Sequence, residues 1–145
     1  MKKVLHISLI ILLVGALIGL RFWEKELFYD PLLVFFEGAY LRAEQLPQLD
    51  VASLLFNTSV RFWLNSTISV SILVLLFGKS GIVKVSLLVY LVVFLLLLVA
   101  FVWFLINYTS AYSLTLFYTR RFLIQPILLL ILIPAFYYDR IRSDK

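Results

Sequence analysis

The sequence predicts an all-α, polytopic membrane protein with four transmembrane helices and an outer amphipathic interfacial helix. Two observations predict this fold class. The first is composition: 63% of the 145 residues are hydrophobic and 14% are charged, and a soluble domain of this length cannot bury so much apolar surface. The second is that charged residues bracket long apolar runs of a length suited to a bilayer. We therefore expect a single membrane domain, residues 1–145.

Three of the four predicted spans are runs of equal length without Asp, Glu, Lys or Arg. Each contains 17 residues and covers about 26 Å as an α-helix, slightly less than a hydrocarbon core. Basic side chains at the ends can reach the interface and make up the difference. The predicted spans are residues 4–20, 62–78, 85–107 and 122–138. The last contains Pro126, tolerable near its start, and Pro134, which predicts a kink.

The first span could be mistaken for a secretory signal peptide, because "MKK" precedes an apolar core. However, "GALIGLRFW" has no clear small-x-small cleavage site, and large residues follow at once. We interpret residues 4–20 as an uncleaved signal anchor.

The distribution of charge predicts that both termini are cytoplasmic in a bacterial inner membrane. Lys2 and Lys3 precede the first span, Lys79 and Lys84 lie in the turn between spans two and three, and the tail 139–145 is basic. In a four-span topology these segments share one side, as the positive-inside rule requires. That side carries seven basic and two acidic residues, whereas the outside carries six of each.

Residues 21–50 form the largest predicted extramembrane segment. In "YDPLL", Asp30 can cap a helix and Pro31 suits its first position. The pattern predicts an amphipathic helix over 31–45, lying on the outer leaflet or capping the bundle. Aromatic residues are frequent on this side, which favours a broad surface in headgroups or against another protein.

A polar stripe follows one face of the helix that contains the second predicted span. Its members are four residues apart: Asn57, Arg61, Asn65 and Ser69. Polar groups in a span must face other helices or water. The stripe is interpreted as helix–helix contacts across the bundle or, alternatively, as a docking groove for a partner's helix or a polar ligand.

Arginines mark the outer boundary of three spans. The equal spans place Arg21, Arg61 and the pair Arg120 and Arg121 at one depth, and Gln125 extends the face of Arg121. Glu24, Glu26 and Asp30 follow Arg21 and are the expected partners. The group is either a set of interfacial ion pairs that brace the helix ends or a site for a lipid phosphate or a partner's carboxylate.

The chain has no cysteine, and its single histidine, His6, lies inside the first apolar run. The sequence contains no cluster of metal ligands, no nucleophile with an adjacent base and no glycine-rich phosphate loop. We expect no catalytic residues, no metal or cofactor and no nucleic-acid partner. The expected partners are membrane lipids and a membrane protein.

Several blocks resemble the small exosortase F system-associated proteins of flavobacteria. They are the lysine-led first span, "RFWEKELFYDP", "RFWLNSTIS", "GKSGIVKVSLLVY" and "RRFLIQPILLLILIPAFYY". Such proteins are encoded near an exosortase, a polytopic transpeptidase that processes C-terminal sorting signals with a catalytic Cys, His and Arg. This chain has no Cys, so the resemblance implies a non-catalytic accessory or assembly partner. The alternatives are a lipid- or anion-binding membrane protein and a small structural subunit of another membrane complex.

Overall fold

The computed structural model describes residues 1–78 and 80–145, and within them every regular element is helical. Lys79, assigned above to the turn between spans two and three, lies outside the described residues. The α-helices are α1 (Lys2–Phe22), α2 (Glu24–Leu27), α3 (Pro31–Glu37), α4 (Val51–Phe77), α5 (Ser80–Ile106), α6 (Ser113–Ile124) and α7 (Ile127–Ser143). Two short 3₁₀ helices, η1 (Tyr40–Arg42) and η2 (Ser110–Tyr112), connect them.

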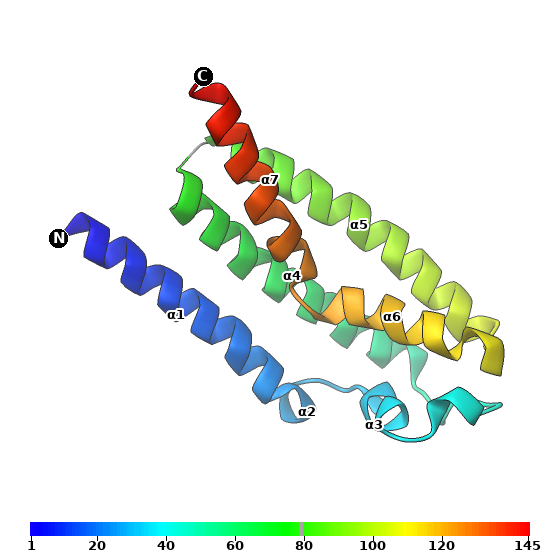
Figure 1. The fold of residues 1–145 in the computed structure, drawn as a ribbon. Helices are drawn as coiled ribbons and strands as arrows, with labels where there is room; N and C mark the ends of the chain where they lie inside the picture. The colour runs from blue at the N-terminus through cyan, green and yellow to red at the C-terminus, as the bar shows by residue number, and fades with distance from the viewer. Residues whose placement is uncertain (79) are drawn as a thin grey trace.

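Helix α4 is the centre of the arrangement. It packs against α1, α5, α6 and α7, and Figure 1 shows α1, α4 and α5 running side by side. Both chain termini lie at one end of this bundle, here called the terminal end (Figure 1). The opposite, distal end carries α2, α3 and η1, and residues 24–42 are here called the distal platform.

Three helices, α1, α4 and α5, are long and apolar enough to cross a membrane. A fourth span exists only if α6 and α7 are counted together, and these two helices meet at a bend of 62°. The prediction of one continuous helix over 122–138 was therefore wrong. Pro126 explains the break, because its ring has no N–H to continue the helical ladder and clashes with the preceding turn. Helix α7 continues through Pro134, where a kink was predicted.

Helix α4 begins at Val51, so it extends beyond the N-terminal end of the predicted span 62–78, and a polar cap marks its start. The Asp50 side chain accepts hydrogen bonds from the Ser53 backbone N–H at 3.4 Å and the Ser53 hydroxyl at 2.6 Å. These bonds satisfy an otherwise unpaired helix N–H and hold the pKa of the Asp50 carboxyl below its ordinary value. At the other end, Gly78 adopts a left-handed φ of 64°, which suits glycine.

The distal platform differs from the predicted helix over 31–45. Helix α3 ends at Glu37, and only the short η1 follows. Pro31 occupies the first turn as expected, but the Asp30 side chain makes no capping hydrogen bond. Its carboxylate is instead used in ion pairs with arginines.

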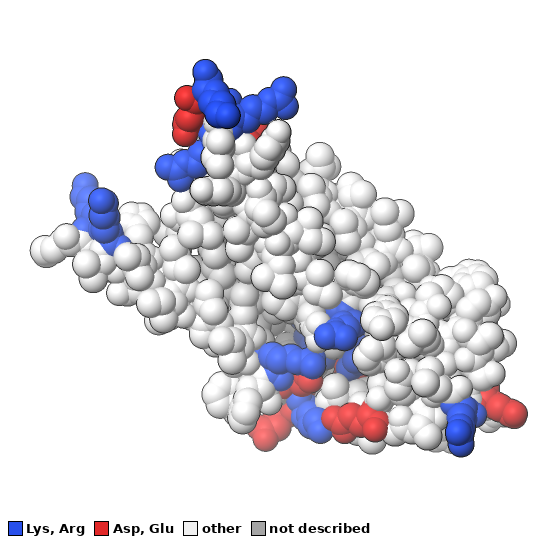
Figure 2. All heavy atoms as spheres, in the orientation of Figure 1, with Lys and Arg blue, Asp and Glu red and all other residues white. Residues whose placement is uncertain are grey.

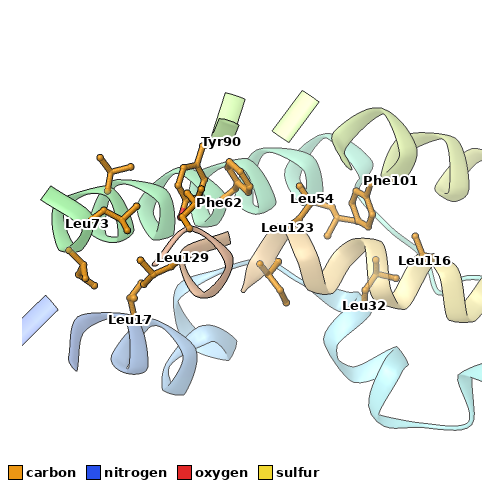
Figure 3. Close-up of a cluster of buried hydrophobic side chains, with 14 of the residues drawn as sticks. Leu17, Leu32, Leu54, Phe62, Leu73, Tyr90, Phe101, Leu116, Leu123 and Leu129 are labelled. Carbon is orange, nitrogen blue, oxygen red and sulfur yellow. The ribbon is translucent and has the colours of Figure 1, made fainter. Parts of the chain in front are cut away.

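Buried apolar side chains attach the distal platform to α6. Leu32 of α3 is fully buried, as is Leu116 of α6, and Figure 3 shows the two at the same end of the core. The ring of Phe117 lies 5.2 Å from that of Phe36 and 5.5 Å from that of Tyr40, measured between centroids. The platform is therefore packed onto the bundle, as the capping interpretation expected.

The surface separates into charged ends and an uncharged band. Figure 2 shows Lys, Arg, Asp and Glu gathered near the terminal end and around the distal platform, with an uncharged surface between them. The exposed side chains of this band on α5 are aliphatic, including Leu88, Leu91, Leu95 and Val99. Such a band is suited to lipid, because hydrocarbon cannot satisfy exposed polar groups.

Candidate functional site

A buried arginine on α4 is the centre of a charged cluster. The Arg61 side chain is 5% exposed. Its Nη2 atom donates to Glu24 Oε2 at 2.5 Å, and its Nη1 atom donates to Asp30 Oδ2 at 3.0 Å. One guanidinium therefore joins α4 to the start of α2 and to Asp30, which immediately precedes α3. Such charge-assisted hydrogen bonds are stronger than those between neutral groups.

Arg120 reaches the same carboxylate from α6. Its Nε atom donates to Asp30 Oδ1 at 3.3 Å, and its Nη2 atom donates to Asp30 Oδ2. Both side chains are almost completely buried. Phenylalanine rings cover the two guanidinium groups, with Arg61 lying 5.1 Å from the centroid of Phe28 and Arg120 lying 5.8 Å from that of Phe36. These cation–π contacts add to the attraction that the ion pairs supply.

Arg21, at the distal end of α1, completes the group. Its Nη1 atom donates to Glu24 Oε2 at 3.0 Å, but its side chain is 54% exposed. We call Arg21, Glu24, Asp30, Arg61 and Arg120 the charge cluster. Three arginines and two carboxylates leave one excess positive charge.

The structure separates Arg121 from this cluster. Arg121 is exposed and, in the described part of the chain, forms no ion pair. Its Nε atom donates to Gln125 Oε1 at 3.0 Å, the spacing that the sequence indicated. Glu26, an expected partner of the arginines, likewise forms no ion pair among residues 1–78 and 80–145. Of the four arginines that the sequence placed at one depth, Arg21, Arg61 and Arg120 thus meet in the charge cluster.

The polar stripe of α4 serves several contacts rather than one. Asn65 donates from Nδ2 to the backbone carbonyl of Ile124 at 2.9 Å. Ile124 is the last residue of α6, so its carbonyl has no donor within that helix. Asn57 instead bonds to Ser53 O in its own helix. Ser69 is fully buried, and its hydroxyl has no partner among the described residues.

An apolar groove lies beside the charge cluster. It has a volume of about 540 Å³ and is walled by α1, α4 and α7. Its lining is aliphatic except at the distal end, which carries Arg21, Arg61, Asn65 and Gln125. Figure 2 shows basic side chains where the surface is hollowed at this end and an uncharged surface beyond it.

Sequence reasoning missed the groove. It expected Asn65 to contact another helix but did not identify the Ile124 carbonyl as the partner. The groove depends on how α1 and α7 diverge from α4, which no local pattern specifies. The break at Pro126 was the available signal for the bond, because a helix that ends inside a span leaves its last carbonyls without donors in the same helix.

The charge cluster and the groove lie next to each other, so together they can bind a molecule that has both a charged group and a hydrocarbon part. Both carboxylates of the charge cluster are paired with arginines, so they act as counter-ions that brace helices. The groove can accept an elongated apolar molecule whose end meets polar donors. In comparisons with known proteins, no protein family, curated protein or solved structure matched this chain.

Proposed function

We propose that this protein is a non-catalytic accessory or assembly partner of an exosortase-type protein-sorting system in a bacterial inner membrane. The blocks that resemble exosortase F system-associated proteins support this function. We further propose that the bent pair α6 and α7 acts as a fourth span and that both termini are cytoplasmic. The common position of the termini at one end of the bundle supports that topology, as does the basic tail.

The observation that carries the proposal is the construction of the distal platform. The platform is fixed from within, by Leu32 in the core and by Asp30 in the charge cluster. Its outer side nevertheless exposes large apolar side chains: Val34 is 69% exposed and Leu41 is 58% exposed. Exposed apolar residues on a preformed surface are typical of protein interaction sites.

The charged residues of the distal platform also suit a surface that binds another protein. Lys25 and Glu37 form an exposed ion pair at 3.0 Å, so the apolar residues have a polar, electrically neutral neighbour. A polar rim around apolar contacts is the common anatomy of a reversible interface. A neutral surface also selects against partners that bind by charge alone.

The absence of cysteine makes a direct test possible, because each introduced cysteine is unique. Val34→Cys and Leu41→Cys would each carry a photoactivatable cross-linker in native membranes. The matched control is Leu88→Cys on α5, which is 63% exposed but lies in the uncharged band. We expect both platform positions to cross-link to an exosortase-type transpeptidase and the α5 position to cross-link to lipid.

A second pair of variants tests whether the contact matters for assembly. Val34→Glu and Leu41→Glu place charges on the exposed surface without touching the core, so the melting temperature should stay unchanged. Co-purification with the transpeptidase should fall. Cross-links to a different membrane complex, or recovery of the chain with lipid alone, would reject the proposed function.

A further inference from the structure

We propose that the groove between α1, α4 and α7 binds a membrane lipid with an acyl chain and an anionic phosphate headgroup. The acyl chain lies along the groove toward the terminal end, and the headgroup lies at the distal end beside Arg21 and Gln125. This binding site goes beyond the accessory function and is independent of the identity of the protein partner.

The lining of the groove suits a hydrocarbon chain. On α1 the lining extends from Arg21 to Ile10, which is about 16 Å along a helix axis. Toward the terminal end the walls are aliphatic, from Val14 on one side to Ile133 on the other. The polar lining residues are confined to the distal end. A ligand that matches this surface has a long apolar part and one polar end.

The size of the groove favours a lipid over a helix of a partner protein. A helix with its side chains is about 10 Å wide or more, so a 16 Å length of it occupies at least about 1,200 Å³. The groove offers about 540 Å³. An acyl chain is thinner than a helix and can enter without displacing α1 from α4.

The charge at the distal end favours an anionic headgroup. The charge cluster carries one excess positive charge, and Arg21 is its most exposed arginine. Among the described residues, the Arg21 side chain donates a hydrogen bond only from Nη1, to Glu24. A guanidinium has five N–H donors, and its remaining donors can form the forked contacts that phosphate accepts.

Gln125 supplies a neutral donor at the same place. Its Oε1 atom accepts from Arg121 Nε, so its amide nitrogen is left to donate at the edge of the groove that Gln125 lines. Arg121 therefore positions Gln125 and adds a second positive charge near the headgroup. This role accounts for an arginine that has no carboxylate partner in the described part of the chain.

The experiment is photolabelling of the purified full chain in nanodiscs of phosphatidylcholine. A small fraction of the lipid carries a diazirine in one acyl chain and is either phosphatidylglycerol or phosphatidylcholine with identical chains. We expect phosphatidylglycerol to label peptides of α1 and α7 about fivefold more strongly, which corresponds to about 1 kcal/mol for a basic contact at a membrane surface. Labelling of α5 should be equal for the two lipids.

Two variants test the headgroup contact and the acyl-chain contact separately. Arg21→Gln should remove most of the preference for phosphatidylglycerol. Because that change also removes an ion pair from Glu24, Val14→Trp provides an independent test by filling the groove away from the charge cluster. It should reduce groove labelling by both lipids. The matched control, Leu88→Trp on the exposed face of α5, should leave groove labelling unchanged.

Several outcomes would overturn the proposal. Equal labelling of the groove by the two lipids, unaffected by Arg21→Gln, would mean that ordinary bilayer lipid lies there. Groove labelling that persists in Val14→Trp would place the acyl chain elsewhere. Loss of the preference on addition of inorganic phosphate at constant ionic strength would show a site for free anions. Because the purified chain is used, none of these outcomes depends on the accessory function.

Discussion

Arg120 and Asp30 are 90 positions apart in the sequence and form an ion pair in which both side chains are almost completely buried. Arg121, the next residue, is exposed and bonds only to Gln125 among the described residues. Two adjacent arginines thus have different tasks, because successive residues of a helix point about 100° apart. Arg120 holds α6 to the start of α3, whereas Arg121 bonds to Gln125, which lines the groove.

This difference predicts unequal effects of two single substitutions on stability. Arg120→Gln removes one of the two arginines that neutralise the Asp30 carboxylate and should destabilise the protein by up to about 3 kcal/mol, reduced because Arg61 remains bound to Asp30. Arg121→Gln should change stability by no more than about 0.5 kcal/mol. Thermal melting in detergent measures both. Equal destabilisation by the two substitutions would contradict the separation of tasks.

The bend between α6 and α7 makes a second prediction. Asn65→Leu removes the donor to the Ile124 carbonyl and should destabilise the bundle by about 0.6 to 2 kcal/mol. Asn57→Leu is the matched control, because Asn57 bonds within its own helix and its loss should cost less. The measurement is thermal melting together with hydrogen exchange of the α7 amides after the bend. An Asn65 variant that melts like the Asn57 variant would exclude the interhelical bond as a support.

The sequence predicted those parts of the fold that depend on local pattern. Composition predicted helices suited to a membrane, and α1, α4 and α5 carry the first three predicted spans. Asp30 and Pro31 correctly marked the start of a helix. The length of that helix was wrong: α3 ends at Glu37, because the backbone of Gly38 is extended and leaves the helical conformation.

In the candidate site, too, local sequence pattern predicted some contacts, whereas others depend on tertiary packing. Close spacing suggested that Glu24 would meet Arg21, which is three residues away. Depth along the spans also placed Arg61 and Arg120 near these carboxylates. The selection of Asp30 over Glu26 could not be predicted, because it depends on the path of the chain between α2 and α3. The groove could not be predicted either, since it arises from the divergence of α1 and α7 around α4.

The cap of α4 makes a prediction about pH. The pKa of Asp50 is lowered, chiefly by the hydrogen bond from the Ser53 hydroxyl. A carboxyl with a depressed pKa stabilises the fold above its unfolded-state pKa, and this contribution is lost as pH falls through the folded-state value. The first turn of α4 should therefore fray in acid, below the ordinary pKa of 3.8.

Hydrogen exchange of the first α4 amides, corrected for intrinsic rates, measures this fraying between about pH 6 and about pH 3. Asp50→Asn is the informative control, because asparagine caps a helix about as well as aspartate but does not titrate. Protection in this variant should be independent of pH. A parent protein whose protection is also constant over this range would show that the carboxylate form is not needed for the cap.

The last prediction concerns the bent pair α6 and α7, which either crosses the membrane or enters and leaves on one side. If α1 starts in the cytoplasm, α5 ends outside, and the side reached by the C-terminus depends only on this pair. A crossing returns the basic tail to the cytoplasm, which agrees with the position of both termini at one end of the bundle. A C-terminal fluorescent protein that folds only in the cytoplasm should therefore be bright, and a C-terminal phosphatase that works only outside should be inactive.

The same reporters fused after Ile106, at the end of α5, provide the control and should give the reverse pattern. Phosphatase activity at both positions would show that the pair is re-entrant and that the chain has three spans.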